Sequence, residues 1–304
     1  MSDQQAPALR LEGVTKRFDE FTAVSDLSLT ALSGRIYGLI GPNGAGKTTT
    51  IRMIVGITAP DEGRVELFGR PAGPETQNRI GYLPEERGLY KKMKVGEQLR
   101  FFGELKGMSG RDADRAAGRW LERLKLSDRR AARTDSLSKG MQQKVQFIAT
   151  VMHDPDLLIL DELFSGLDPV NVELMKEVVL ELKAAGRAII FSTHMMEHAE
   201  KLCDDICLIN RSRKVLEGRL REVKESFSRN SVALRAEGGD GVLADARLVA
   251  SVKPHGDYVE ALLAEGADAQ ELLRALVAAG ARVSKFEHVE PSLHDIFIAK
   301  VGEA

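Results

Sequence analysis

The chain has 304 residues, in which 43 Lys and Arg oppose 45 Asp and Glu to give a formal net charge of −2. At roughly 150 residues per domain, this length predicts about two domains, with ample chain to bury a core. The balanced charge excludes a strongly basic protein, so no nucleic-acid partner is expected.

The cysteines and the N-terminus bear on the location of the protein. Cys203 and Cys207 are the only cysteines and form no paired framework or ligand cluster, which favours a reducing, cytosolic setting. The N-terminal segment MSDQQAPALR lacks the basic start and apolar run of a secretory signal. No charge-free stretch reaches the ~18 apolar residues that a spanning helix needs. We therefore expect a cytoplasmic protein, which at a membrane depends on another protein to cross it.

The most specific motif is GPNGAGKTT, residues 41–49, which fits the pattern G-x-x-x-x-G-K-[ST]. The apolar run RIYGLI before it suits a buried strand, and residues 51, 54 and 55 after it are apolar at helical spacing. In such a loop, backbone N–H groups and the helix N-terminus surround phosphates, while Lys47 supplies a mobile charge and Thr48 can bind Mg²⁺. A glycine-rich turn without function is the weaker alternative. The predicted nucleotide-binding residues of this loop are Gly41, Asn43, Gly44, Gly46, Lys47, Thr48 and Thr49.

Three helices are expected in the middle of the chain. Two helical patterns cover residues 95–107 and 110–126. A third helix follows LSKGM, with Ser138 as its N-cap residue. Its expected buried face consists of Met141, Val145, Ile148, Ala149 and Met152.

A second chemical motif lies in DPDLLILDELFSGLD, residues 154–168. The apolar run at 157–160 is typical of a buried parallel strand and ends in Asp161 and Glu162. Acids at the carboxyl end of such a strand lie at the edge where α/β sheets bind ligands. We expect Asp161 to reach a Mg²⁺ ion and Glu162 to act as general base on a water, a role worth about 10²- to 10⁴-fold in rate. The alternative is a pair of solvated acids that end a strand.

After about residue 222 the phosphate motifs stop, and a polar, glycine-containing stretch marks a boundary. Strands are expected at 231–236, 246–253 and 257–263, and a helix at 268–280 with Asp268 and Glu271 placed as a capping box. A last short helix begins near Ser292, and no catalytic constellation is present in this part.

Over roughly residues 8–222, these motifs resemble the nucleotide-binding domain of the ATP-binding cassette (ABC) family. The resemblance implies an α/β fold: a P-loop NTPase core with an inserted helical subdomain at about 90–153 and an antiparallel β subdomain, together forming a domain 1–222. Residues 223–304 then form a small α+β domain, similar to the accessory domain on ATPase subunits of bacterial sodium or drug exporters, with a dimer-stabilising or regulatory role.

By this resemblance, LSKGM is the signature segment, which contacts ATP held by a second copy of the chain. Ser138 would offer its hydroxyl and Gly140 its backbone N–H to the γ-phosphate across the interface. Lys139 and Met141 depart from the family's usual L-S-G-G-Q, and Lys139 adds a positive charge near that phosphate.

Four further positions match the family one by one. Phe18 resembles the aromatic residue that stacks on adenine, with a core phenylalanine as alternative. Glu85 occupies the place of a glutamine that touches Mg²⁺, and a carboxylate can still bind that ion. Asp168 matches the loop that crosses the dimer, and also suits a helix N-cap before Pro169. His194 resembles the switch histidine that contacts the γ-phosphate, although a lone histidine is often structural.

The function implied is that of the ATPase subunit of an exporter. Two copies, or one copy and a related ATPase subunit, would close on two Mg-ATP and drive a separately encoded transmembrane permease from the inner face of the membrane. Docking of that permease is expected near Gly88, Leu89, Tyr90 and Met93. One alternative is a soluble ABC ATPase that acts on ribosomes or DNA. The other is a regulatory module that binds ATP with weak turnover.

Overall fold

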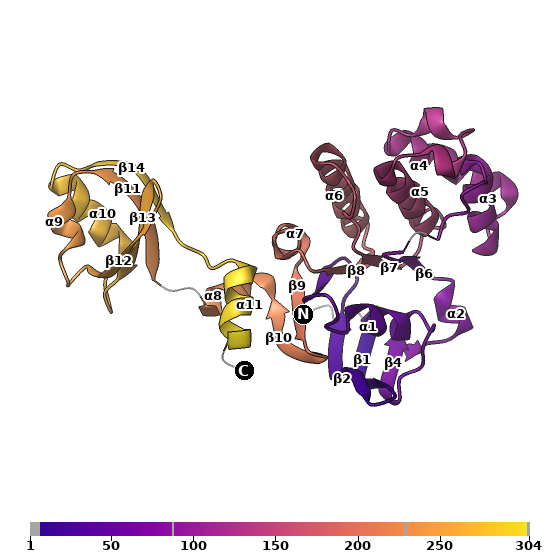
Figure 1. The fold of residues 1–304 in the computed structure, drawn as a ribbon, viewed down its shortest axis with the longest axis horizontal. Helices are drawn as coiled ribbons and strands as arrows, with labels where there is room; N and C mark the ends of the chain where they lie inside the picture. Colours follow the sequence, from indigo (N-terminus) through magenta and orange to yellow (C-terminus); the bar gives the residue numbers. More distant parts are fainter. Residues whose placement is uncertain (1–6, 87, 228–229, 303–304) are drawn as a thin grey trace, which may run out of the picture. The chain divides into compact units, whose positions relative to one another are not determined.

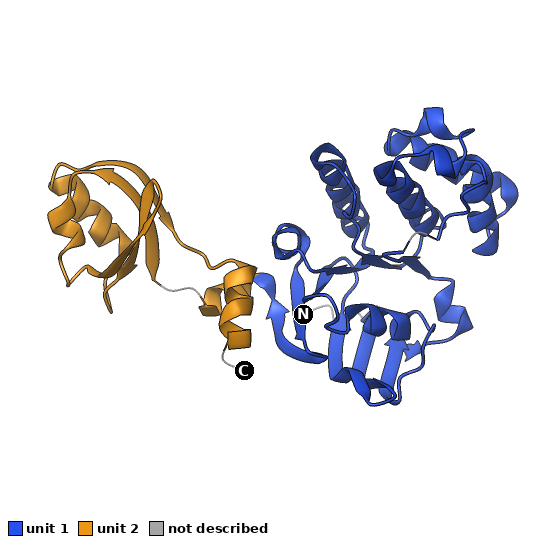
Figure 2. Cartoon of the chain, in the orientation of Figure 1, with its two compact units in different colours: residues 1–220 blue, residues 221–304 orange. Residues whose placement is uncertain are grey.

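The computed structural model of the chain describes residues 7–86, 88–227 and 230–302. The chain divides into two compact units, residues 1–220 and 221–304 (Figure 2). The boundary expected from sequence, after residue 222, lies two residues further along.

Unit 1 is built on a six-stranded sheet with the strand order β10-β9-β3-β8-β7-β6 (Figure 1). The strands from β9 to β6 pair in parallel, and β10 pairs with β9 in antiparallel fashion. Every residue of β3, β7 and β8 is buried, which explains why these strands read as continuous apolar runs. The strands are β3 (Ile36–Ile40), β6 (Ile80–Leu83), β7 (Leu157–Asp161), β8 (Ala188–Thr193), β9 (Asp205–Asn210) and β10 (Arg213–Arg219).

A second, antiparallel sheet of unit 1 has the order β2-β1-β4-β5. Its strands are β1 (Leu9–Phe18), β2 (Phe21–Ala31), β4 (Glu62–Leu67) and β5 (Arg70–Pro71). Helix α1 (Lys47–Ile54) lies between the two sheets (Figure 1), and one hydrophobic core joins residues of both sheets and of α1. This core fixes the phosphate loop, because α1 begins where the loop ends.

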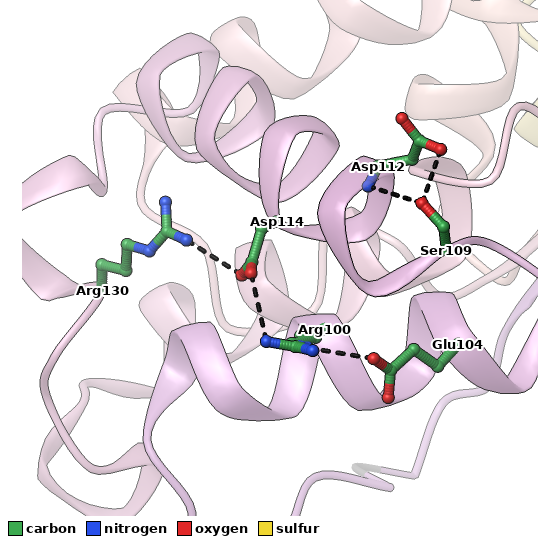
Figure 3. Close-up of polar contacts among 6 residues, drawn as sticks. All are labelled: Arg100, Glu104, Ser109, Asp112, Asp114 and Arg130. Carbon is green, nitrogen blue, oxygen red and sulfur yellow. Dashed lines mark hydrogen bonds and ion pairs between the residues drawn. The ribbon is translucent and has the colours of Figure 1, made fainter.

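The helical subdomain contains α3 (Val95–Leu105), α4 (Gly110–Arg123) and α5 (Lys139–Val151), with α2 (Pro74–Gln77) before them. A network of half-exposed ion pairs joins α3 and α4 (Figure 3). Arg100 of α3 contacts Glu104 at 3.0 Å and Asp114 of α4 at 3.4 Å, and Arg130 contacts the same Asp114 at 3.1 Å. Ion pairs this exposed contribute about 0–1 kcal/mol each, so their effect is mainly on the relative orientation of α3 and α4.

Helix α5 differs from the amphipathic helix that the sequence predicts. It is buried almost all round, and its buried residues include Gln143, Lys144 and Gln146, while Met141 and Ala149 of the expected face are only partly buried. Polar side chains are tolerated there because each bonds to a neighbouring loop, as described below. Two more helices, α6 (Pro169–Ala184) and α7 (Met196–Leu202), follow β7 and β8.

Unit 2 contains a four-stranded antiparallel sheet of order β12-β13-β11-β14. With α9 and α10 this gives the chain order β-α-β-β-α-β, which is the ferredoxin-like arrangement. Residues of β11, β13 and α10 share its core. The elements are α8 (Leu220–Phe227), β11 (Ser231–Glu237), α9 (Asp240–Leu243), β12 (Val249–His255), β13 (Tyr258–Leu263), α10 (Ala269–Ala278), β14 (Arg282–His288) and α11 (Leu293–Gly302).

The fold class predicted from sequence, a P-loop NTPase core with a helical and a β subdomain and a small α+β domain after it, is confirmed. Three elements of unit 2, the helices α8 and α9 and the strand β14, were not predicted, and α8 lies where the sequence indicated a polar boundary.

Candidate functional site

The phosphate loop connects β3 to α1 and is held by its own lysine. Lys47 Nζ donates to the carbonyl oxygens of Gly41 at 2.7 Å and Pro42 at 3.1 Å. Two glycines are needed by the geometry. A Cβ on Gly41 would lie 2.1 Å from the carbonyl oxygen of Ile209, and Gly46 has a φ of +108°, which L side chains rarely adopt. The loop therefore presents backbone N–H groups at the start of α1, as phosphate binding requires.

A cavity of 460 Å³ opens over this loop. It collects most of the predicted site residues, from the phosphate loop, the Glu85 loop and the end of β7. The residues that line it are Phe21, Ala23, Asn43, Gly44, Gly46, Lys47, Thr48, Thr49, Glu85, Asp161 and Glu162.

Thr48 and Asp161 form the part of the cavity suited to a hard cation. Thr48 Oγ1 donates to Asp161 Oδ2 at 3.3 Å, so a hydroxyl and a carboxylate oxygen already lie side by side. Burial raises the pKa of Asp161, and the charges of Glu162 and Glu85 raise it further. Among the described residues, no group of three or more His, Cys, Asp and Glu could hold a metal ion unaided. The donor set fits Mg²⁺, which takes few protein oxygens together with phosphate oxygens.

Glu162 and His194 form the second chemical feature. His194 Nδ1 lies 2.7 Å from Glu162 Oε1, and the backbone N–H of His194 donates to the same oxygen at 3.0 Å. Thr193 Oγ1 lies 3.3 Å from the other oxygen. The φ of Glu162 is +49°, a left-handed conformation that costs energy for a residue with a Cβ. A strained, buried carboxylate with its orientation fixed by three donors is typical of a catalytic base.

Lys47 is the positively charged residue of the phosphate loop, and its pKa reflects both burial and the nearby carboxylates. Burial lowers the pKa of its ammonium group, whereas Glu162, Asp161 and Glu85 act in the opposite direction. The cavity therefore combines one partly buried cation with three carboxylates. A divalent ion would offset part of the negative charge that the carboxylates and bound phosphates bring together.

The Glu85 loop is tied to α5. Gln146 Nε2 donates to the carbonyl oxygens of Pro84 and Glu86, both at 3.1 Å, and so fixes the backbone on each side of Glu85. The neighbouring Gln143 donates to Leu163 O at 3.0 Å, directly after Glu162. One helix thus holds two segments of the cavity wall.

Ser138, Gly140 and Asp168 do not line this cavity. Ser138 caps α5 by accepting from the backbone N–H of Met141 at 3.2 Å, and Asp168 caps α6 by accepting from Asn171 N at 2.9 Å. A Cβ on Gly140 would lie 3.3 Å from Gly166 O, so the two segments pack against each other. Both helix-cap interpretations are therefore correct in the single chain.

The two segments are also joined by a buried lysine. Lys144 Nζ of α5 donates to Leu124 O at 2.9 Å and to Asn171 Oδ1 at 3.0 Å. Asn171 Nδ2 in turn donates to Asp168 at 2.6 Å. Sequence reasoning missed Lys144, because a lysine in a helical pattern indicates an exposed position.

Two phenylalanines at the β1–β2 hairpin need to be distinguished. Phe18 is 49% exposed, has Lys16 Nζ 5.5 Å from its ring centroid, and is not part of the cavity wall. Phe21, its partner in the strand register, is 61% exposed and does line the cavity. Phe21 was not predicted as a site residue, and its pairing with Phe18 across the hairpin is the signal that could have identified it.

A glycine-rich phosphate loop before a helix, with paired acids at the end of a strand of the same parallel sheet, defines a P-loop nucleotide hydrolase. Comparison with known proteins narrows this class. The profile of the family described as ABC transporter matches residues 24–165, and the profile described as ATP-binding protein DrrA1-3-like, C-terminal domain, matches residues 218–301. The chain belongs to the ATP-binding proteins of ABC transporters, which are ATPases coupled to transport.

Individual relatives agree with this assignment. The chain is 47% identical over 294 residues to the uncharacterized ABC transporter ATP-binding protein YhaQ of Bacillus subtilis (strain 168), covering 97% of this chain and 98% of that protein. It is 35% identical over 302 residues to the Nod factor export ATP-binding protein I of Rhizobium sp. (strain N33), covering 97% of each. A solved ATP-binding subunit of an ABC transporter matches with a TM-score of 0.68 and 31% identity, over 72% of this chain and 93% of that one.

Within the described ranges, each helix is too short or too polar to pass through a bilayer.

Proposed function

We propose that this chain is the ATP-hydrolysing subunit of an ABC exporter, which closes as a dimer around two Mg-ATP and drives a separate transmembrane subunit. The observation that carries the proposal is the Glu162 carboxylate, which lines the cavity over the phosphate loop and is held by His194 Nδ1 at 2.7 Å. Export is suggested by the relatives named Nod factor export ATP-binding protein I.

Hydrolysis in this proposal depends on a few side chains. Lys47 and the loop N–H groups bind the phosphates, and Glu162 accepts a proton from the attacking water. A carboxylate only accepts hydrogen bonds, so His194 donates from Nδ1 and holds Glu162 in one orientation. Mg²⁺, held by Thr48, Asp161 and Glu85, would supply positive charge beside the phosphate oxygens. This pairing argues against a module that only binds ATP, because binding alone needs no oriented base.

Dimerisation is inferred from where the remaining motif residues lie. Ser138 and Gly140 lie on one segment and Asp168 follows a second segment packed against it, and none of the three lines the cavity of its own chain. The N-terminus of α5 and the Ser138 hydroxyl suit a phosphate brought by another molecule. A second copy, or a related ATPase subunit, would supply that phosphate, with Phe18 or Phe21 at its adenine.

The transmembrane partner is assigned to the surface beside the Glu85 loop. Tyr90 is 52% exposed, and its ring lies 5.9 Å from Phe101 and 6.1 Å from Phe102. Gln98, which is fully buried, accepts from the backbone N–H of Tyr90 and donates to Thr134. An aromatic cluster on a braced loop, next to a cavity-lining residue, is suited to transmit ATP binding to a docked subunit. The protein would then lie at the inner face of the membrane.

The test is a tagged Glu162→Gln variant, isolated with Mg-ATP from solubilised cells, with Glu122→Gln on exposed α4 as the matched control. We expect Glu162→Gln to bind ATP, to lose hydrolysis by about 10²- to 10⁴-fold, and to accumulate as an ATP-bound dimer with a polytopic membrane protein. Glu122→Gln should hydrolyse ATP as the natural chain does. Full turnover in Glu162→Gln would refute the assigned base, and ribosomal or chromosomal partners in place of a membrane protein would favour a soluble ATPase.

A further inference from the structure

We propose that unit 2 contains a binding site for a small amphipathic organic anion, between its sheet and α11. A cavity of 370 Å³ lies there, within the size range of small-molecule sites. The sheet contributes Ser231, Lys253, His255 and Glu260 to its wall, and α11 contributes Ile296. The residues that line this cavity all belong to unit 2, and none of them lines the nucleotide cavity of unit 1.

Ser231 supplies the first argument. Its side chain alternates along β11 with that of Val232, which packs in the core shared with α10, so Ser231 belongs to the opposite face of the sheet. Ser231 is 1% exposed, and its hydroxyl has no hydrogen-bond partner among the residues that the structure describes. A buried hydroxyl without a partner costs about 1–3 kcal/mol, so a ligand that bonds to it recovers that cost.

The charges on the wall supply the second argument. Three carboxylates face the cavity, and each already accepts a hydrogen bond or ion pair. The pairs are Glu260 with His255 at 3.3 Å, Glu290 with Lys224 at 3.3 Å, and Asp295 with the backbone N–H of Ser292 at 3.2 Å. The ammonium group of Lys253, in contrast, has no ion pair or side-chain hydrogen bond in the described part of the chain, although Lys253 pairs in register with Glu260 on β13. The available donors are therefore one ammonium and one hydroxyl, which together suit a carboxylate or similar oxyanion.

The other residues of the cavity wall indicate that the rest of the ligand is apolar. Phe227, Val289, Pro291 and Ile296 present carbon surface, and Ile296 is almost fully buried beside the cavity. A head group alone would leave most of the volume empty, whereas an apolar body would cover the exposed parts of Phe227, Val289 and Pro291. One unpaired ammonium among the described residues of the wall also matches a monoanion and not the multiple charges of a nucleotide.

The experiment is calorimetric titration of the full chain with decanoate, below its micelle concentration, using decanol and decylammonium as probes with the same apolar body. We expect decanoate to bind at one site, at least about tenfold tighter than either probe, since the difference reports the charged head. Ser231→Ala and Lys253→Met should each weaken decanoate binding at least about fivefold. Arg274→Met removes one positive charge from exposed α10, and should bind decanoate as the natural chain does.

Three results would overturn the proposal. The first is decylammonium binding as tightly as decanoate, and the second is decanoate binding that does not saturate. The third is equal weakening by Lys253→Met and Arg274→Met, because the attraction would then be long-range. The comparison of the three probes uses the natural chain, so it stands even where a variant folds poorly.

Discussion

His194 Nδ1 and the backbone N–H of the same residue both point to Oε1 of Glu162, at 2.7 and 3.0 Å. The backbone N–H of His194 holds the carboxylate in place. The imidazole ring provides a second donor, Nδ1, to the same oxygen. His194 consequently orients the Glu162 carboxylate, which is the base in the proposed mechanism.

Replacement of His194 separates these roles. His194→Ala removes the ring donor and should lower kcat about 10²-fold with ATP affinity unchanged, since the base keeps its charge but loses its orientation. In His194→Asn the amide nitrogen can occupy the place of Nδ1, so this variant should recover part of the loss. The measurement is steady-state ATPase activity with nucleotide binding in parallel. His288→Ala in unit 2 is the control, and equal losses in the Ala and Asn variants would contradict an orienting role.

Glu85 offers a prediction about the metal. Its charge lies in the same cavity as Asp161 and Glu162 and helps to raise the pKa of Asp161. Glu85→Gln should therefore bind ATP about 3- to 10-fold tighter when Mg²⁺ is absent, because one repulsive charge is gone. The same variant should need more Mg²⁺ for half-maximal hydrolysis, since a carboxylate ligand is lost.

Glu86→Gln is the matched control, since Glu86 is exposed and does not line the cavity. Nucleotide titrations with and without Mg²⁺ provide the comparison. Equal effects of the two substitutions would mean that Glu85 acts only through the general surface charge.

Lys144 leads to a prediction about stability. Burial lowers the pKa of its ammonium group, which nevertheless remains bonded to Leu124 O and Asn171 Oδ1. Lys144→Met leaves both acceptors without their donor and should lower the free energy of unfolding by about 2 kcal/mol. Lys139→Met, on the exposed first turn of the same helix, should change it by less than about 0.5 kcal/mol. Urea unfolding of both variants measures these free energies. A Lys144→Met variant as stable as the natural chain, with normal ATP-dependent dimerisation, would show that the lysine is dispensable.

The sequence predicted the phosphate loop and the two acids at the end of β7 because their chemistry is local: a fixed spacing of glycines, or an apolar run followed by charge. It did not predict the environment of α5. Gln143, Lys144 and Gln146 look polar and exposed in a helical pattern, and only the tertiary fold reveals the loop carbonyls that they bond. The strand β14 was missed because it pairs with β11, about 50 residues away, whereas Phe21 was missed although its pairing with Phe18 is local.

His153 gives a prediction about pH. Its ring is partly buried, its Nε2 lies 3.2 Å from Ile80 O, and Lys106 Nζ donates to the same oxygen at 3.1 Å. Burial lowers the pKa of His153, and the charge of Lys106 lowers it further. The unfolded chain, with the ordinary histidine pKa near 6.5, therefore binds a proton more readily than the folded chain below that pH. Stability contributed by neutral His153 is present above about pH 6.5 and is lost as the pH falls towards the lower folded pKa.

The effect can be at most about 1.4 kcal/mol per pH unit for one proton. His153→Gln keeps a donor for Ile80 O but cannot titrate, so its free energy of unfolding should fall less between pH 7.5 and 5.5 than that of the natural chain. His288→Gln, on exposed β14, should follow the natural chain. Unfolding curves at several pH values give the slopes directly. If His153→Gln and the natural chain lose stability in parallel, the ring is protonated as easily in the folded state as in the unfolded one, and its burial has no electrostatic cost.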